Sequence, residues 1–429
     1  MSAVWDWAGR HRAAFHCGSD KTVVLVSGLS PNAVAMEAGS VLDVPVPGSL
    51  PRSLSVVHRH KWLGLLWAAD LDFGAALEVR LHQAAAAFAP LAGLVAAKAL
   101  PLGLAMQLFE SKVDAILGQG RWLFVTVLDA QPVLDNQYAR WARALLGADA
   151  WRNGFVAASE VGWGLSGFAR AVRSAALRRA SLWRLPVNDL YRDAFVRSSA
   201  LCVGWAGRSA AVLSDWGVMD WPEWAGSSLP PTPRRYKAYL TAQLLRATAS
   251  SWHAGVAGHA AQVPYLTFAS GRAGVLLRAR AAQLDWPCAI ALRCWCRLRA
   301  GLLVLRAVGG RVSSARFQQC IACGRVVRNA TVHSVGSCCR WISLRTSFCR
   351  AVGLEDASAQ SISHVLLGCS PGRAGFTEAV GLAEALDVFA GHYWASGNTK
   401  VVGWLVGWLV GWLALQGYPA WRGLPERSP

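Results

Sequence analysis

Three cysteines and one histidine stand close together in the sequence, and their spacing limits how that part of the chain can fold. Their pattern is Cys320-x2-Cys323-x9-His333-x4-Cys338. Three thiolates and an imidazole are the four ligands of a closed tetrahedral zinc site, which leaves no position for a reactive water. Gly324, directly after the second cysteine, permits the tight turn that such a site needs. The spacing therefore predicts a structural zinc ion and not a catalytic one.

The cysteines leave two alternatives open. Cys339 could replace its neighbour as the fourth ligand, or the cluster could consist of ordinary buried cysteines beside a hydrogen-bonded histidine. Cys288, Cys294 and Cys296 have no histidine at metal-binding spacing, so we expect them to be structural. The first residues of the chain lack the apolar run of a signal peptide. We therefore expect an intracellular protein of the nucleus or cytoplasm, not secreted and without a disulfide framework.

The basic residues are concentrated in one part of the chain. Of 429 residues, 43 are Lys or Arg and 25 are Asp or Glu, a net charge of +18. Residues 234–350 hold 18 basic residues and a single acid, Asp285, whereas residues 1–233 carry a net +3 and residues 351–429 a net −2. Such a block repels itself unless it faces a polyanion, and nucleic-acid phosphates are the usual partner. A solvated basic surface on a protein of another function is the alternative.

We expect phosphate contacts from basic residues of this block and from those beside the metal motif. The candidates are Arg234, Arg235, Lys237, Arg293, Arg297, Arg299, Arg325 and Arg328. Tyr236, Tyr239 and Trp295 could stack on unpaired bases, and a place in the core is the alternative for each. The chain has neither a phosphate-binding loop motif nor a serine nucleophile elbow, so no small-molecule substrate is predicted.

The hydrophobic pattern predicts a mainly α protein with a small β-hairpin element near its start. Lys21–Val26 is a β-branched run, and Lys61–Trp67 is an apolar run suited to one arm of a hairpin. Asp215–Pro233 is rich in Pro, Gly and Trp and is expected to be a linker. Stretches rich in Ala and Leu predict helices over residues 75–99, 101–117, 133–146, 167–185, 189–198, 234–252, 287–308, 340–352 and 377–393.

A low-complexity segment lies near the end of the chain. Val401–Leu415 repeats the letters VGWL and is shorter than the roughly 20 apolar residues that span a bilayer. We therefore predict no membrane span there. Its regularly spaced glycines could pack helices together, so self-association through residues 401–415 is one role open to it.

These features stand in an order that resembles the C-terminal part of a non-LTR retrotransposon reverse transcriptase. Residues 15–28, FHCGSDKTVVLVSG, resemble the lysine-containing palm motif of that family, and residues 60–64, HKWLG, resemble its primer-grip hairpin. The helical run from Phe73 to Leu185 is similar to the thumb and connection. The Cys320–Cys338 cluster looks like the CCHC zinc finger, or zinc knuckle, that follows the thumb. By the same resemblance, Lys61 is a nucleic-acid-binding candidate.

The resemblance implies a division of the chain into consecutive regions. A palm-end and primer-grip remnant comes first, a helical thumb-like bundle and connection follow, and a small zinc-knuckle module comes late. The expected regions are 1–73 (palm end), 74–214 (thumb and connection), 215–233 (linker), 234–316 (basic helical region), 317–350 (zinc knuckle), 351–396 (C-terminal helices) and 397–429 (low-complexity tail).

The same family polymerises DNA with carboxylates that hold two metal ions. This sequence has no Asp-Asp pair, so we expect no catalytic residues and no polymerase activity from this chain alone. The expected function is binding of RNA or an RNA–DNA duplex, with zinc as a structural cofactor. The alternative is a helical structural or interaction remnant that does not bind nucleic acid specifically.

Overall fold

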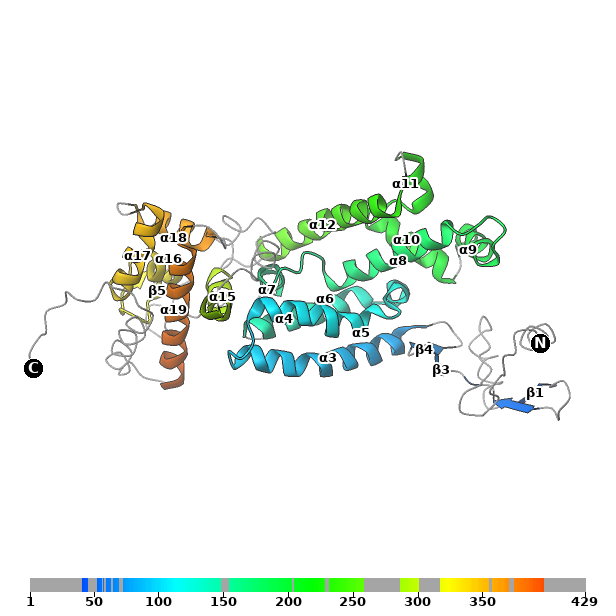
Figure 1. Cartoon of the computed structure of the whole chain (residues 1–429), viewed down its shortest axis with the longest axis horizontal. Coiled ribbons are helices and arrows are strands. Elements are labelled where there is room, and N and C mark those ends of the chain that lie inside the picture. The colour runs from blue at the N-terminus through cyan, green and yellow to red at the C-terminus, as the bar shows by residue number, and fades with distance from the viewer. Residues whose placement is uncertain are drawn as a thin grey trace, which may run out of the picture. The chain divides into compact units, whose positions relative to one another are not determined.

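The protein is mainly helical. Its structure is a computed structural model, and within the described residues it also contains three two-stranded antiparallel sheets (Figure 1). The mainly α class expected from the sequence is confirmed. The expected strand at 21–26 and the tail at 397–429 lie outside the described residues. The structure describes residues 41–44, 52–55, 57, 59–62, 65–68, 72–147, 154–202, 204–227, 231–257, 286–300, 317–354, 357–369 and 374–396.

The chain divides into two compact units, each built from segments that are far apart in the sequence. Unit 1 comprises Met1–Ala89, Glu110–Gln137 and Leu165–Thr248. Unit 2 comprises Pro90–Phe109, Tyr138–Gly164 and Ala249–Pro429. The finer division into consecutive palm, thumb and knuckle regions stays a prediction.

The β element consists of short hairpins. β1 (Val41–Val44) pairs with β2 (Arg52–Ser55), and β3 (Arg59–Trp62) pairs with β4 (Leu65–Ala68). The apolar run at 61–67, expected to be one arm of a hairpin, supplies residues to both arms, because Trp62 pairs with Leu65. That expectation was wrong since the run contains a chain reversal that its apolar composition does not reveal.

Unit 1 is an assembly of helices around one apolar core. Ser166 and Asp189 accept hydrogen bonds from the first backbone N–H groups of two of these helices and so define where they begin. Phe124, Phe168 and Leu240 are buried together in the core. The helices, some of which continue into unit 2, are α3 (Gly74–Ala96), the π-helix η1 (Phe109–Val113), α5 (Asp114–Gly118), the 3-10 helix η2 (Arg121–Thr126), α8 (Gly167–Trp183), α9 (Leu190–Ala200), α10 (Gly204–Asp215), α11 (Trp221–Ser227) and α12 (Pro233–Ala257).

The Pro- and Trp-rich stretch at 215–233, expected to be a linker, takes part in the core of unit 1. It contains α11, and Trp224 of this helix is buried. The Trp224 ring lies 5.1 Å from the ring of Tyr236, which is itself fully buried in α12. The tryptophans of this stretch therefore bury apolar surface, which is the dominant favourable term in folding.

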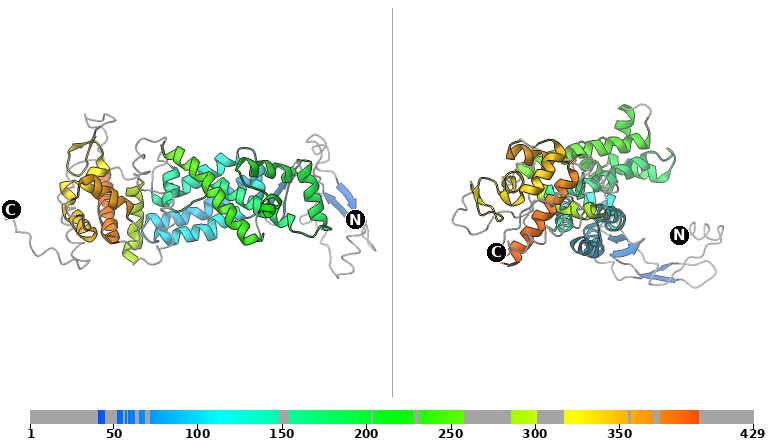
Figure 2. Two further views of the ribbon diagram at one scale, coloured as in Figure 1. Left: turned by 90° about the horizontal axis from the view of Figure 1, so that it is seen from above. Right: turned by 60° about the vertical axis from the view of Figure 1, so that its left-hand side comes forward.

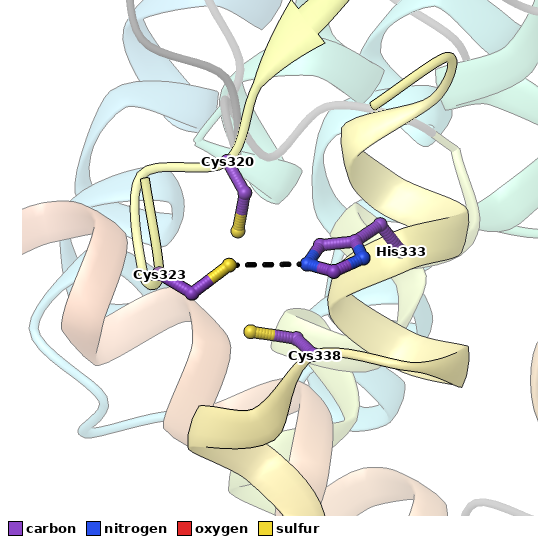
Figure 3. A group of neighbouring side chains, drawn as sticks. All are labelled: Cys320, Cys323, His333 and Cys338. Atoms are coloured by element: carbon purple, nitrogen blue, oxygen red, sulfur yellow. Dashed lines mark hydrogen bonds between the residues drawn. The ribbon is translucent and has the colours of Figure 1, made fainter. Parts of the chain in front are cut away.

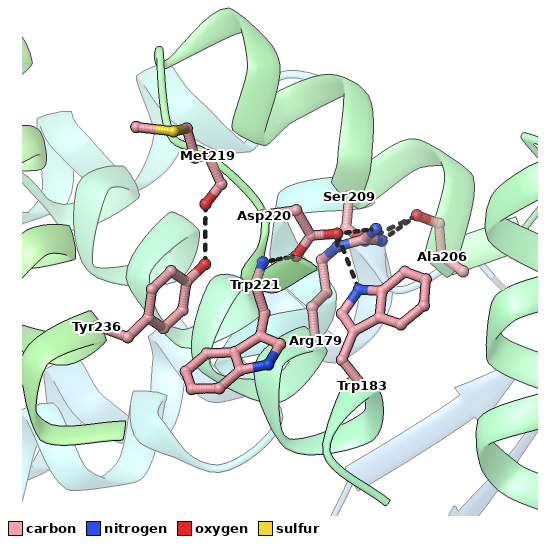
Figure 4. A network of polar contacts seen from close by, with 8 residues as sticks. All are labelled: Arg179, Trp183, Ala206, Ser209, Met219, Asp220, Trp221 and Tyr236. Carbon is pink, nitrogen blue, oxygen red and sulfur yellow. Dashed lines mark hydrogen bonds and ion pairs between the residues drawn. The ribbon is translucent and has the colours of Figure 1, made fainter. Parts of the chain in front are cut away.

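A buried arginine joins three helices of unit 1 (Figure 4). Arg179 of α8 is 2% exposed, and its guanidinium donates to the Asp220 carboxylate at 2.6 and 3.0 Å. It also donates to the Ala206 carbonyl and, at 3.0 Å, to the Ser209 hydroxyl, both on α10. The indole N–H of Trp183 donates to the same Asp220 oxygen. The charge that helix α8 buries is thus fully compensated, as a buried guanidinium requires.

Unit 2 contains a cluster of packed aromatic rings. Phe109, Tyr138, Trp141 and Trp163 lie with their ring centroids between 4.3 and 5.8 Å apart. The helices of the unit, in part shared with unit 1, are α4 (Leu102–Leu108), α6 (Ala130–Leu146), α7 (Gly154–Glu160), α15 (Trp286–Arg299), α16 (Ala330–Gly336), the 3-10 helix η4 (Cys339–Trp341), α17 (Ile342–Val352), α18 (Ala359–Gly368) and α19 (Phe376–Ser396). The last four described α-helices, α16 to α19, lie together in Figures 1 and 2.

The expected helices are present to within a few residues wherever the structure describes them. Five of the described α-helices were not expected, namely α7, α10, α11, α16 and α18. α7 and α16 have seven residues each, which is too short for the helical period of apolar residues to show. Among the described helices, α3 is long and apolar enough to cross a bilayer by length and composition, a property that core helices share.

Replacing Asp220 with Asn should destabilise the protein by about 3–5 kcal/mol, because it leaves the buried Arg179 guanidinium without a charge partner. Chemical denaturation measures the loss. The matched control is Asp193→Asn, which breaks an exposed ion pair with Arg197 and should cost less than about 0.5 kcal/mol. Equal effects of the two substitutions would show that the buried network does not hold unit 1 together.

Candidate metal centre

Two local elements bring the four Cys/His residues together. A hairpin formed by β5 (Gln318–Gln319) and β6 (Val326–Val327) holds Cys320 and Cys323 in its turn. The Cys320 N–H donates to the Arg325 carbonyl at 2.9 Å, and the Gly324 N–H donates to the Cys320 carbonyl at 2.9 Å. Gly324 has φ +73°, a left-handed conformation that glycine adopts without strain. The turn expected from the sequence is therefore formed.

Helix α16 supplies the histidine. Asn329 begins the helix by accepting a hydrogen bond from the Val332 N–H at 3.0 Å. His333 follows one turn later and points toward the hairpin (Figure 3). The chain then leaves the helix, and the N–H of Cys338 donates to the His333 carbonyl at 2.7 Å. This bond places Cys338 next to the other three residues of the cluster.

The four side chains form a compact donor set. Their ligand atoms all lie within 4.8 Å of one another, with the Cys323 sulfur 3.2 Å from the His333 Nε2 atom. A tetrahedral zinc ion with Zn–S bonds of about 2.3 Å separates its sulfur ligands by about 3.8 Å. Shifts well below 1 Å for each side chain therefore suffice to bind zinc. Cys320, Cys338 and His333 are buried, as the ligands of a structural ion usually are.

Each cysteine sulfur accepts a hydrogen bond from the backbone N–H two residues further along the chain. Ala322 donates to Cys320, Arg325 to Cys323 and Arg340 to Cys338. Backbone donors of this kind stabilise the negative charge of a thiolate. The repeat at all three cysteines is the strongest local sign that the cluster is built for a metal and is not a chance group of buried thiols.

Protons occupy the cluster when metal is absent. The hydrogen bond from Cys338 lowers the pKa of Cys320 to about 4, against the opposing effect of burial. The same contact raises the pKa of Cys338 above its ordinary value. Burial raises the pKa of Cys323. The metal-free cluster at neutral pH therefore holds one thiolate and two thiols, and a bound metal displaces the two protons.

A serine orients the histidine. The Nδ1 atom of His333 lies 3.0 Å from the Ser337 hydroxyl oxygen, on the ring edge opposite Nε2. When Nε2 binds a metal, Nδ1 carries the proton and donates it to this hydroxyl, which holds the ring in place. Ser337 was not among the residues expected from the sequence, where its only signal is its position between His333 and Cys338.

Cys339 is exposed, whereas its neighbour Cys338 is buried in the cluster. The alternative in which Cys339 is the fourth ligand is therefore wrong for this conformation of the chain. Cys294 and Cys296 of α15 are buried, as expected of structural cysteines. Burial raises the pKa of both thiols, which makes them unreactive. The side chain of Cys288 lies outside the described residues.

The module that holds the cluster is anchored on α18. Gly336 of α16 leaves no room for a side chain, because an added Cβ would lie 2.2 Å from the Ala359 carbonyl oxygen. The Ser363 hydroxyl donates to the Val332 carbonyl at 3.1 Å. Trp341 packs edge to face on Phe389 of α19 with centroids 5.5 Å apart. These contacts hold the cluster on longer helices of unit 2.

Six of the nine expected nucleic-acid-binding residues are exposed. They are Lys61, Arg234, Arg235, Lys237, Arg325 and Arg328. Lys61 lies on β3, and the next three lie in the first turns of α12. Arg325 and Arg328 flank β6 beside the cluster. Their side chains are therefore accessible to a phosphate group, and the expected contacts stay a prediction.

The three arginines of α15 serve the interior of unit 2 instead. Arg299 is 4% exposed and donates to the buried Glu160 carboxylate at 3.1 Å. Arg297 pairs with Asp387 of α19. Arg293 donates to the Val95 carbonyl at 3.4 Å. Two of these guanidiniums are paired with acids and the third is half-buried against α3, so all three have internal partners, and phosphate contacts from α15 stay a prediction.

The aromatic candidates for base stacking also lie inside the protein. Tyr236 is fully buried, and its hydroxyl donates to the Met219 carbonyl at 3.0 Å. Trp295 is 1% exposed and packs on Phe376. The hydroxyl of the half-buried Tyr239 accepts from the Met219 N–H. The alternative in which these rings belong to the core is confirmed for Tyr236 and Trp295.

Comparisons with known proteins identify no relative of this chain. No family model, no curated protein and no solved structure matches it. The resemblance to a retrotransposon reverse transcriptase therefore stays a prediction, and the argument for function depends on the site itself.

The purified full-length protein should contain one zinc ion per chain by elemental analysis, because four N/S ligands already lie together. Cys320→Ser/Cys323→Ser should lose the metal. Cys339→Ser should keep it, since that cysteine is exposed and is not one of the four clustered residues. Retention of zinc by the double variant would contradict the site.

Zinc binding at pH 8 should release about two protons, because the pKa values of Cys323 and Cys338 are both raised and Cys320 is already a thiolate. Calorimetric titrations of the metal-free protein in buffers of different ionisation enthalpy measure this number. Affinity should therefore fall as the pH is lowered. Release of fewer than one proton would mean that the thiols do not bind the metal.

Proposed function

We propose that residues 317–354 form a structural zinc knuckle that binds the phosphate backbone of a nucleic acid. The observation that carries the proposal is the joint presence of a closed N/S donor set and a strongly basic surface around it. A closed donor set leaves no open coordination position, so the metal would support the fold and perform no chemistry. RNA and an RNA–DNA duplex are the ligands that the resemblance favours.

The charge of the knuckle supports this proposal. Residues 317–354 contain five arginines and no acidic residue. Arg345 donates to the Cys338 carbonyl at 2.9 Å and so supports the cluster. The other four are exposed, namely Arg325, Arg328, Arg340 and Arg350. Arginine binds phosphate oxygens through two parallel N–H groups, which gives affinity without a choice of base sequence.

Helix α12 offers a second basic surface. Arg234, Arg235 and Lys237 are exposed in its first turns, while Tyr236 between them is buried. This alternation places the cations on the solvent side of a helix whose other side is held in the core of unit 1. Such a helix can add phosphate contacts without any change of fold.

Binding of a single-stranded RNA should weaken steeply as salt is raised, because each phosphate contact releases bound counterions. Arg325→Ala/Arg328→Ala should weaken binding and reduce the log–log salt slope by about 1.4, the contribution of two contacts. Fluorescence anisotropy over a salt series measures both quantities.

The matched control is Arg197→Ala/Arg208→Ala, which removes the same charge from exposed positions on α9 and α10. It should leave the slope unchanged. A flat salt profile for the wild-type protein would contradict nucleic-acid binding. An equal effect of the two double variants would show that net charge, and not the knuckle, attracts the RNA.

A further inference from the structure

Three arginines of unit 1 lie near one another, and none of them belongs to the basic block at residues 234–350. Arg121 begins η2, and Arg170 and Arg173 lie three residues apart on α8, where they are neighbours on one face. The Asp114 carboxylate of α5 lies 2.8 Å from Arg121 and 3.4 Å from Arg170. We call this group the arginine triad.

Two members of the triad are held in fixed positions. Arg121 donates to the Asp114 carbonyl at 2.6 Å in addition to its ion pair with the carboxylate. Arg170 donates to the Leu165 carbonyl at 3.5 Å. The side chains of Arg121, Arg170 and Asp114 are 13–16% exposed, so the group is sheltered but still open to solvent. It is therefore preorganised on three packed helical elements.

Arg173 is the member without an acidic partner. Its Nε atom is buried and has no hydrogen-bond partner among the described residues. No carboxylate of the described chain forms an ion pair with it, and burial together with the nearby Arg170 and Arg121 lowers its pKa. A half-buried cation beside two like charges is costly, unless an anion from outside completes the site.

The charges of the triad fit a phosphate group. Among the described residues of this group, three guanidiniums and one carboxylate leave two positive charges in a sheltered place. A phosphate group at neutral pH carries about 1.5 to 2 negative charges and oxygen atoms that accept the paired N–H groups of arginine. A carboxylate ligand would compensate only one of the two charges and offers fewer acceptors.

We propose that Arg121, Arg170 and Arg173 form a phosphate-binding site on unit 1, which binds its ligand independently of the zinc knuckle. The site takes a phosphate group either from a nucleic-acid backbone or from a small phosphorylated molecule. Arg173 binds the ligand directly, and Asp114 positions the other two arginines. All four side chains belong to unit 1.

The first test is thermal unfolding of the full-length protein while inorganic phosphate replaces chloride at constant ionic strength. Phosphate should raise the Tm of the wild-type protein. Arg173→Met should weaken phosphate binding about tenfold or more, because a charge-assisted bond is lost. In the absence of phosphate, Arg173→Met should melt no lower than the wild type, since the substitution removes a repelled and partly buried cation.

Two variants serve as controls. Arg208→Met removes an exposed arginine from α10 of the same unit and should keep the full response to phosphate. Arg325→Ala/Arg328→Ala should also keep it, even when RNA binding at the knuckle is lost. An unchanged phosphate response in Arg173→Met would overturn the proposed site and leave the knuckle proposal intact. If Arg173→Met lost the phosphate response but Arg325→Ala/Arg328→Ala bound RNA as the wild type does, the knuckle proposal would be contradicted and the phosphate site supported.

A second measurement separates the two sources of phosphate. A short RNA without a terminal phosphate is titrated into the wild-type protein and into Arg173→Met. Weaker RNA binding by the variant identifies the backbone phosphate as the ligand. Equal RNA binding together with a lost response to inorganic phosphate identifies a small phosphorylated molecule. A variant that matches the wild type in both titrations excludes the site.

Discussion

A buried guanidinium needs a carboxylate, and this chain has only 25 acidic residues to set against 43 basic ones. In the structure, some of these acids form ion pairs with arginines that are buried in the interior. Asp220 meets Arg179 in unit 1, and Glu160 meets Arg299 in unit 2. Both arginines are almost completely buried, and each also donates to a backbone carbonyl. The packing of each unit depends on these matched pairs.

The functions that we propose use arginines that are not buried in such pairs. Around the zinc cluster, the exposed arginines have no carboxylate within residues 317–354 to neutralise them. In the arginine triad, one carboxylate pairs with Arg121 and Arg170, and Arg173 has no ion pair with a described acid. A site whose charge the protein leaves uncompensated is the place where a phosphate gains most from binding. Both surfaces thus follow from the excess of basic over acidic residues in this chain.

The Cys/His cluster offers a solution to a different problem, which is the small size of the module that contains it. The module from the β5–β6 hairpin to α17 is short, and its first helix has seven residues. Isolated helices of this length are unstable in water. Four ligands that converge on one ion, together with backbone N–H groups aimed at the sulfurs, can hold such a short segment in place. Anchoring on α18 then orients the basic surface.

The sequence by itself determined the helical class, most long helices and the composition of the metal cluster. These properties depend on local patterns, because helical periodicity, capping residues and the spacing of Cys323 and His333 are all readable along the chain. It did not determine which arginines are exposed. Arg299 and Arg325 look alike in the sequence, yet one meets Glu160 from a distant segment and the other faces solvent. Only the tertiary structure decides this, since it alone brings a carboxylate 139 residues away within hydrogen-bonding distance.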